Sequence, residues 1–377
     1  MKMDRREFLE SLFGFGVASL IGGCATGNAG AARPHPYRVA VLGDTHYDKA
    51  PESVYHSHYD ESNKWAKVQH EEFRRNGEMW RERCPALVAA CAKTLPPPAF
   101  LLQLGDLVQG DCDDAATHEE MLEDAVEAIR QPFDCPFFTV VGNHDIRGKG
   151  AREAYKNFIK YFMFGELMRL GATKIRKDGH VASFDYEGDR WIFCDFESRD
   201  IARLVKALDA AGDARHVFLV THGPFTTPDA RSFRWRLAGR EACDAARPLL
   251  YEALSRRHAI VLSGHTHTTA FYRHENESGG FTELTVNSVW AEPEQASAEV
   301  ISSGAEGYGE IARKTMPAER LAAYEEQLAF FRPGLKEYLF FGNAAGHYDL
   351  AVGEDAVTAR FYPGAAETAA RSFDLKQ

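Results

Sequence analysis

Five short apolar segments of this sequence each run into polar side chains of the same few types. The segments are YRVAVL, AFLLQL, PFFTVV, HVFLV and HAIVL, and such runs are typical of buried strands. The polar residues that follow them are Asp44 and His46, Asp106, Asn143 with His144, His222, and His265 with His267. Because the carboxyl ends of strands in an open α/β sheet meet at one crevice, we expect these side chains to converge.

Stretches between these segments have the character of helices. CPALVAACAKTL precedes the second segment, and HEEMLEDAVEAIR, with apolar residues at helical spacing, precedes the third. Strands that alternate with helices indicate an α/β fold with a largely parallel component. Turn residues at 187–189 and 353–355 separate adjacent strand-like runs, so two hairpins are also expected. Hairpins together with α/β units predict two sheets packed together and flanked by helices.

The side-chain types at the strand ends are those of a metal site with mixed oxygen and nitrogen ligands. Carboxylates, imidazoles and an amide oxygen together suit manganese, iron or zinc. Glycines beside these residues, as in GD, GNHD and GHTH, allow tight turns and close approach of the backbone. Any one of these residues could instead cap a strand or lie in a solvated turn. The complete set of five strand ends favours a shared metal site.

The charge balance of the chain argues against one broad class of function. Acidic side chains number 55 against 44 basic ones, for a net charge of −11 over 377 residues. Proteins that bind the nucleic-acid backbone usually present a basic surface, so no nucleic-acid-binding surface is expected. A small phosphorylated substrate stays compatible with this charge because a bound metal reverses the local field.

The first 32 residues are expected to be an export signal and linker rather than part of the fold. Arg5 and Arg6 precede an apolar run that is short for a membrane span, a pattern that resembles a twin-arginine export signal. LIGGC resembles a bacterial lipoprotein box, which would leave Cys24 as a lipid-modified N-terminus. The alternative is an ordinary cleaved signal peptide in which Cys24 is incidental. Contact with a membrane is expected only through that lipid.

The cysteines do not indicate a metal-binding or redox motif. Six remain after Cys24, and none forms a C-x-x-C pair, which argues against a zinc ribbon or a thioredoxin-like site. An even number in an exported protein permits disulfides without fixing their pairing. Cys135 and Cys194 lie in strand-like apolar runs and are expected to be small buried core residues.

The ordered set D-x-H, G-D, G-N-H-D, a strand-end His and G-H-x-H resembles the calcineurin-like metallophosphoesterase superfamily. The resemblance extends from Tyr37 to about Tyr362. It implies an α/β fold of two packed mixed β-sheets flanked by helices, a four-layer α/β/β/α sandwich. It also implies hydrolysis of a phosphate ester by a hydroxide held between two divalent metal ions, whether manganese, iron or zinc.

The resemblance also implies a role for each matching residue. One metal would be held by Asp44, His46, Asp106 and His267, and the second, bridged by Asp106, would be completed by Asn143, His222 and His265. His144 would be catalytic: it would face the leaving oxygen of the substrate and stabilise or protonate it. In some members an aspartate orients this histidine. This chain has Gln109 at that position, which leaves Asp111 or Asp145 as alternatives for the orienting group. Purple acid phosphatases have a tyrosine at that position, so a purple di-iron enzyme is not expected.

The expected domain organisation follows from this resemblance. A metallophosphoesterase catalytic domain is expected over 36–365, followed by a tail at 366–377. Insertions near 47–83 and 292–342 interrupt the domain, and long excursions of this kind are often lids or binding loops. Several side chains in these insertions and elsewhere could contact substrate, although a solvated role is favoured for the histidines and arginines and a packing role for the tryptophans: His56, His58, His70, His274, Trp65, Trp80, Trp290, Arg231, Arg234 and Arg236.

The expected function is hydrolysis of a phosphodiester or phosphomonoester outside the cytoplasm. The substrate would be a nucleotide or another small phosphorylated molecule, and the protein would be periplasmic or a membrane-anchored lipoprotein of a bacterial envelope. The alternative is a non-catalytic surface lipoprotein that uses the same fold to bind a metal or ligand. The sequence leaves the oligomeric state open.

Overall fold

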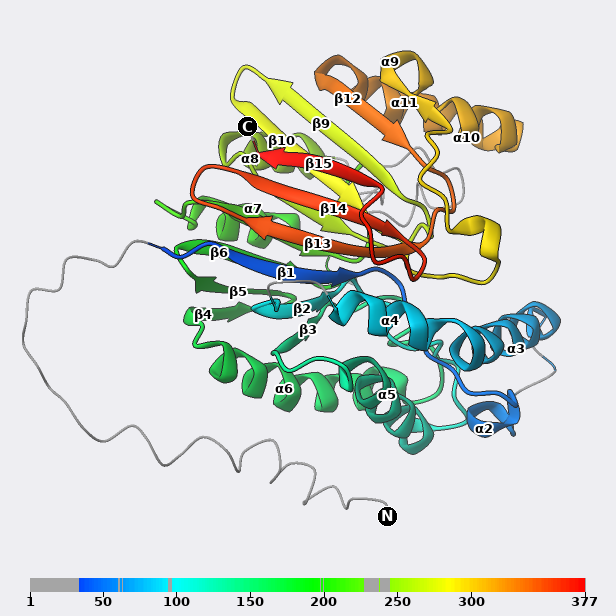
Figure 1. Ribbon diagram of the computed structural model, residues 1–377. Coiled ribbons are helices and arrows are strands. Elements are labelled where there is room, and N and C mark those ends of the chain that lie inside the picture. The colour runs from blue at the N-terminus through cyan, green and yellow to red at the C-terminus, as the bar shows by residue number, and fades with distance from the viewer. Residues whose placement is uncertain are drawn as a thin grey trace, which may run out of the picture.

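Two β-sheets stack face to face, and helices cover both outer faces (Figure 1). The computed structural model describes residues 34–59, 62, 64–93, 97–196, 198, 200–226, 237 and 245–376. Both sheets contain parallel and antiparallel neighbours, so the expected α/β fold of two packed mixed sheets flanked by helices is confirmed.

The first sheet carries the strands that precede Asp44, Asp106 and Asn143 in the chain. Its order is β15-β14-β13-β1-β2-β3, in which β1, β2 and β3 are parallel and the others antiparallel. The strands are β1 (Tyr37–Leu42), β2 (Phe100–Gln103), β3 (Phe137–Thr139), β13 (Gly346–Val352), β14 (Val357–Pro363) and β15 (Arg371–Lys376).

The second sheet carries the strands that end near His222 and His265. Its order is β11-β12-β9-β10-β8-β7-β6-β5-β4, with β6, β7, β8 and β10 parallel. The strands are β4 (Thr173–Asp178), β5 (Val181–Tyr186), β6 (Asp189–Cys194), β7 (Val217–Thr221), β8 (Ile260–Ser263), β9 (Ala270–Asn276), β10 (Gly279–Thr285), β11 (Ser302–Ser303) and β12 (Leu335–Phe340).

The helices form the two outer layers. Helices α3 to α6 contribute apolar residues to a core against the first sheet, and α7, α8 and α11 do so against the second. Their bounds are α2 (Ser53–His56), α3 (Ala66–Glu82), α4 (Cys84–Ala92), α5 (Ala115–Arg130), α6 (Ala151–Leu170), α7 (Ile201–Asp209), α8 (Arg247–Arg256), α9 (Gly304–Gly307), α10 (Glu310–Thr315) and α11 (Ala318–Phe331), with 3₁₀ turns η2 (Pro293–Gln295) and η3 (Arg332–Gly334). Asp114 caps α5 by accepting a hydrogen bond from the Thr117 amide, as expected of an aspartate at a helix start.

A third core fills the space between the sheets. Every residue of β2, β6, β7 and β8 is buried, which accounts for their continuous apolar sequences. At its centre the ring of Trp191 stacks on Phe218 of the neighbouring strand, with ring centroids 3.9 Å apart. The Trp191 indole N–H donates to the Tyr37 hydroxyl at 3.1 Å, which satisfies its one polar atom.

The two hairpins expected from turn residues are present, as β5–β6 and β13–β14. The stretch 292–342 contributes more to the framework than a surface excursion would. Strand β12 pairs with β9, and α11 buries Tyr324, Leu328 and Phe331 in the core outside the second sheet. The residues expected to be a tail include β15, which pairs with β14 at the edge of the first sheet.

The described cysteines, Cys84, Cys91, Cys112, Cys135 and Cys194, are buried and make no disulfide bond. Cys135 and Cys194 are thus core residues, as expected. Cys243 and the segment with Arg5, Arg6 and Cys24 lie outside the described residues. Among the helices that the structure describes, none is long and apolar enough to cross a membrane.

Candidate metal centre

The predicted site residues all lie together at the carboxyl ends of β1, β2, β3, β7 and β8. Ligand atoms of Asp44, His46, Asp106 and His267 form one compact group, and those of Asp106, His222 and His265 form another. Asn143 joins the second group, since its Oδ1 is 3.2 Å from His222 Nε2. The structure therefore brings every predicted site residue into one place, while the binding of metal by each one stays a prediction.

The backbone at this site is held in an unusual conformation. His46, Asp106, His265 and His267 have φ values of 41°, 50°, 69° and 51°, in the left-handed region. This conformation costs a residue other than glycine about 1–2 kcal/mol, and such strain is typical of functional sites. These strand ends therefore depart from simple extended geometry at the residues that point into the site.

Gly142 allows the loops to approach closely. A Cβ atom at this position would lie 2.1 Å from the Asp106 amide nitrogen and 2.2 Å from its Oδ1. No side chain fits there, so the glycine of GNHD is needed to bring the end of β3 against Asp106.

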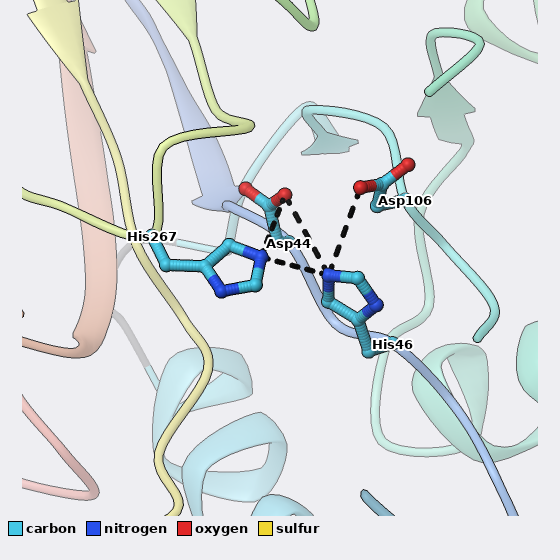
Figure 2. Close-up of side chains that lie close together, drawn as sticks. All are labelled: Asp44, His46, Asp106 and His267. Carbon is cyan, nitrogen blue, oxygen red and sulfur yellow. Dashed lines mark hydrogen bonds and ion pairs between the residues drawn. The ribbon is translucent and has the colours of Figure 1, made fainter. Parts of the chain in front are cut away.

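The first group surrounds the Nε2 atom of His46 (Figure 2). This atom lies 2.9 Å from His267 Nε2, 3.6 Å from Asp106 Oδ2 and 3.9 Å from Asp44 Oδ1. His267 Nε2 in turn lies 3.6 Å from Asp44 Oδ1. Two imidazole nitrogens and two carboxylates thus face a common point.

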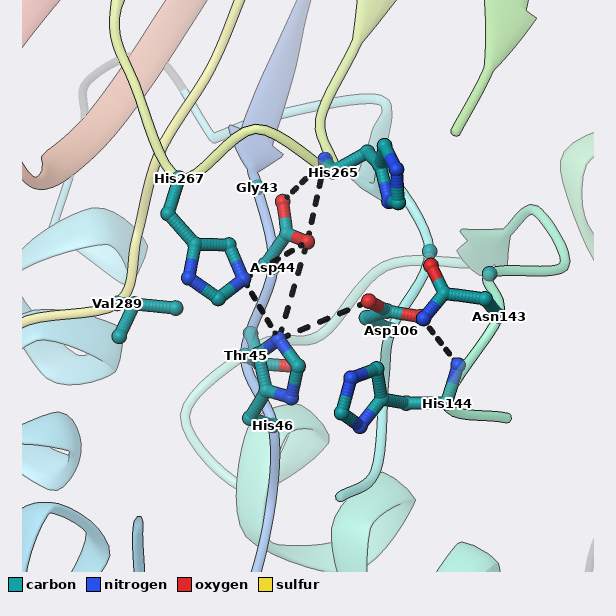
Figure 3. A network of polar contacts seen from close by, with 12 residues as sticks. Gly43, Asp44, Thr45, His46, Asp106, Asn143, His144, His265, His267 and Val289 are labelled. Carbon is teal, nitrogen blue, oxygen red and sulfur yellow. Dashed lines mark hydrogen bonds and ion pairs between the residues drawn. The ribbon is translucent and has the colours of Figure 1, made fainter. Parts of the chain in front are cut away.

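The second group surrounds the Nε2 atom of His222. It lies 3.2 Å from Asp106 Oδ2 and 3.1 Å from His265 Nδ1. His222 Nδ1 donates to the Leu104 carbonyl at 2.8 Å, which leaves Nε2 to face the site. Asp106 lies between the two groups (Figure 3) and is the carboxylate common to both.

The protonation of three of the four candidate ligand imidazoles fits a metal site, whereas the Asp106 carboxylate outweighs burial and raises the pKa of His222 to about 9. Burial lowers the pKa of His46 and His267 well below the usual value, and burial together with the charge of His222 lowers that of His265 to about 3. These rings are therefore neutral, the form in which histidine binds a metal. Neutral nitrogens that face one another and two carboxylates at these distances suit a divalent cation with mixed nitrogen and oxygen ligands.

The pKa values of the two carboxylates shift in opposite directions. Burial raises the pKa of Asp44 to about 8. Although burial acts in the same direction on Asp106, the charged imidazole of His222 holds its pKa well below the usual range. A divalent cation would favour the ionised form of both carboxylates, as nearby positive charge does in general.

His144 is oriented by a group that the sequence did not indicate. Its Nδ1 donates to the backbone carbonyl of Gln109 at 2.7 Å, and its ring lies edge-on to that of His46. Neither suggested aspartate has this role. Asp145 accepts hydrogen bonds from the amides of Val108 and Gly142, and Asp111 forms an ion pair with Arg147.

Arg147 is a site residue that sequence reasoning missed. Its Nη1 lies 3.0 Å from Nε2 of His144, and its Nε lies 2.5 Å from Asp111 Oδ2. Burial and the Arg147 charge lower the pKa of His144 to about 3, so this imidazole is neutral. Arg147 stands three residues after His144, and no motif of the sequence marks the position.

Of the other side chains that the sequence analysis gave as possible substrate contacts, some pack against neighbouring rings and others are exposed to solvent. His56 and His274 are buried and stack on Phe73 and Phe281, so a solvated loop position is wrong for both. The remaining ones are His58, which is exposed, His70, which is half-buried, Trp80, which packs on Tyr47, Trp290, which is half-buried, and Trp65, which is exposed. Arg231, Arg234 and Arg236 lie outside the described residues.

Comparison with known proteins assigns the family. The sequence profile of the calcineurin-like phosphoesterases matches residues 37–269, which is more than half of the chain. The chain belongs to this family. As a calcineurin-like phosphoesterase it is an enzyme that hydrolyses phosphate esters with the help of divalent metal ions, and the clustered ligands are compatible with that chemistry. Family membership thus favours the enzyme over the alternative of a non-catalytic binding protein.

Solved structures with the same architecture agree on the fold. The calcineurin-like phosphoesterase is similar to a purple acid phosphatase from yellow lupin (Lupinus luteus) seeds, with 12% identity, a TM-score of 0.50, and coverage of 91% of this chain and 54% of that one. It is also similar to PhoD, with 10% identity, a TM-score of 0.51, and coverage of 92% and 71%. The chain thus spans about half the length of the lupin protein. The comparison with curated proteins finds no match.

Proposed function

We propose that this calcineurin-like phosphoesterase uses two divalent ions to hydrolyse a mono- or diester of a nucleotide or another small phosphorylated molecule. The observation that carries the proposal is that two groups of ligand-type side chains share Asp106. In this proposal Asp44, His46 and His267 hold one ion with Asp106, and the second ion is held by Asp106, Asn143, His222 and His265. Such a pair supplies an activated water nucleophile and takes up charge that develops on the phosphoryl oxygens.

Among the described residues, His144 and Arg147 lie beside this centre and are placed to act on the substrate. The Nδ1 hydrogen of His144 is bound to the Gln109 carbonyl, so Nε2, which accepts a hydrogen bond from Arg147 in this structure, is the nitrogen that would face a leaving oxygen. The adjacent Arg147 guanidinium is permanently charged and attracts an anionic phosphate. An anion placed there favours the protonated imidazole, the form that donates a proton to the leaving group.

The test is hydrolysis of two model esters by the purified chain from Pro34 to Gln377. Bis-nitrophenyl phosphate reports diesterase activity and nitrophenyl phosphate reports monoesterase activity. We expect turnover of at least one ester by chelator-treated protein after addition of Mn²⁺, with two ions bound per chain. The ratio of the two kcat/KM values then assigns the ester class.

The proposal fails in either of two ways. Absence of turnover of both esters with Mn²⁺, Fe²⁺ and Zn²⁺ would argue against the activity. Saturation at one ion per chain, measured by elemental analysis after dialysis, would argue against the two-ion site.

We also propose that the enzyme acts outside the cytoplasm. Support comes from the sequence of the first 32 residues, with Arg5, Arg6 and Cys24. In a bacterium with the twin-arginine exporter, the full-length chain is expected in the membrane fraction of the envelope. Replacement of both arginines by lysine should retain the protein in the cytoplasm, and Cys24→Ser should release it from the membrane. An unchanged distribution in both variants would contradict the proposal.

A further inference from the structure

The side chain of Gln109 lies between the metal centre and helix α3. It is buried, with 1% of its surface exposed, and its Oε1 accepts hydrogen bonds from His46 Nδ1 at 2.9 Å and from Asn76 Nδ2 at 2.6 Å. Its Nε2 donates to Glu72 Oε2 at 3.3 Å. Three polar contacts thus connect this one amide to His46 and to two residues of α3.

These contacts determine which end of the Gln109 amide faces His46. A carboxylate such as Glu72 can only accept hydrogen bonds, so the group nearest to it must be the amide nitrogen. The amide oxygen therefore faces His46, where it requires a proton on Nδ1. A neutral imidazole that carries its proton on Nδ1 has its lone pair on Nε2, the atom that faces Asp44, Asp106 and His267.

The main chain of the same residue acts on the second imidazole beside the centre. The Gln109 carbonyl accepts the Nδ1 hydrogen of His144 at 2.7 Å. Both His46 and His144 are therefore held in the tautomer that turns Nε2 toward the site. Gln109 therefore acts on both imidazoles, on His46 through its side chain and on His144 through its main chain. It stands at the position where the sequence departs from the aspartate or tyrosine of related enzymes.

Helix α3 is fixed firmly enough to hold Gln109 in place. The Trp80 indole N–H donates to the Thr45 carbonyl at 2.8 Å, next to His46 in the chain. Gly77 lies directly against the loop after β1, since a Cβ atom there would be 2.8 Å from the Ala50 amide nitrogen. Phe73 and Met79 are buried. Helix α3 of the insertion near 47–83 thus packs directly against the loop that carries His46.

We infer that Gln109 is a positioning residue that sets His46 for metal binding, and that Asn76 and Glu72 of α3 hold Gln109 in the required orientation. The inference rests on the proposed metal site. Groups that orient a ligating histidine commonly contribute 10- to 100-fold to metal affinity. The insertion therefore has a function in the chemistry of the site, although none of its described residues belongs to the two ligand groups.

The experiment compares Mn²⁺ binding by isothermal titration calorimetry in wild-type protein and in Gln109→Met. Methionine keeps the length of the side chain and removes the acceptor. We expect Mn²⁺ affinity at one site to fall by about 10- to 100-fold, with an unchanged circular dichroism spectrum. Gln69→Met is the matched control, because Gln69 also links α3 to this loop through Asp111 but does not contact His46. Its affinity is expected to equal that of wild type.

A double variant keeps the test decisive if Gln109→Met folds poorly. This variant combines Gln109→Glu with Glu72→Gln. The carboxylate at position 109 again offers His46 an acceptor, and the amide at position 72 now donates the hydrogen bond that position 109 donates in the wild type. We expect this variant to regain Mn²⁺ affinity to within a few-fold of wild type.

Three results would overturn the inference: wild-type affinity in Gln109→Met, equal loss in Gln69→Met, or no recovery in the double variant. A wild-type protein that binds no Mn²⁺ would instead contradict the proposed function.

Discussion

Replacement of Asp106 by asparagine is expected to lower Mn²⁺-dependent kcat/KM by roughly 10²–10³-fold or more. Asp106 is the carboxylate shared by both ligand groups, so the loss of its charge affects both ions. Asparagine has nearly the same shape and can still accept the hydrogen bond that the His144 amide donates to Oδ1 at 2.7 Å. The fold should therefore persist while metal content falls. Steady-state kinetics and elemental analysis on the same preparation measure both quantities.

Asp189→Asn provides the control for Asp106→Asn. Asp189 is equally buried but lies at the start of β6, where it pairs with Arg215 at 2.7 Å and accepts from the Tyr37 hydroxyl. Its replacement should lower stability and leave kcat/KM and metal content close to wild type. Wild-type turnover and metal content in Asp106→Asn would show that the shared carboxylate is not a ligand.

Replacement of Trp191 by alanine is expected to lower the free energy of unfolding by about 3–5 kcal/mol. The side chain is fully buried between the sheets, stacks on Phe218 at 3.9 Å and bonds the Tyr37 hydroxyl. Alanine leaves a cavity in this core, and the Tyr37 hydroxyl loses one hydrogen-bond partner. Trp191 stands near the amino end of β6, whereas the site lies at the carboxyl ends of the strands, so kcat/KM of the folded protein should change little.

Denaturant unfolding with wild type, Trp191→Ala and Trp65→Ala measures this effect. Trp65 is 59% exposed, and its replacement is expected to change stability by less than about 0.5 kcal/mol. A loss below about 1 kcal/mol in Trp191→Ala would contradict the assigned place of this residue in the core.

The strand ends were predictable because the information is local in the sequence. A buried strand, a glycine and a polar residue follow one another within a few positions, as in LSGHTH. The same holds for helices such as α5, whose apolar spacing and capping Asp114 lie within a single segment. The strand ends were expected to converge because carboxyl ends of strands meet at one crevice, and the resemblance to the phosphoesterases then implied a role for each residue.

Contacts between distant segments were not predictable in this way. The sequence marks Gln109 only as a departure from the family pattern, and its role depends on Asn76 and Glu72, which are 33 and 37 positions away. Arg147 is close to His144 in the chain, but only the turn between them directs its guanidinium toward the imidazole. His56 and His274 have the polarity of loop residues, and their burial comes from the rings of Phe73 and Phe281.

The sequence by itself therefore determined the fold class, the family and the set of side chains that meet at the strand ends, because each depends on short-range order along the chain. The tertiary structure decided which nitrogen of each imidazole faces the site, which residues contact the other nitrogen, and that α3 packs against the loop that carries His46. These properties depend on hydrogen bonds between segments that only the packed fold brings together, such as that between Gln109 and His46.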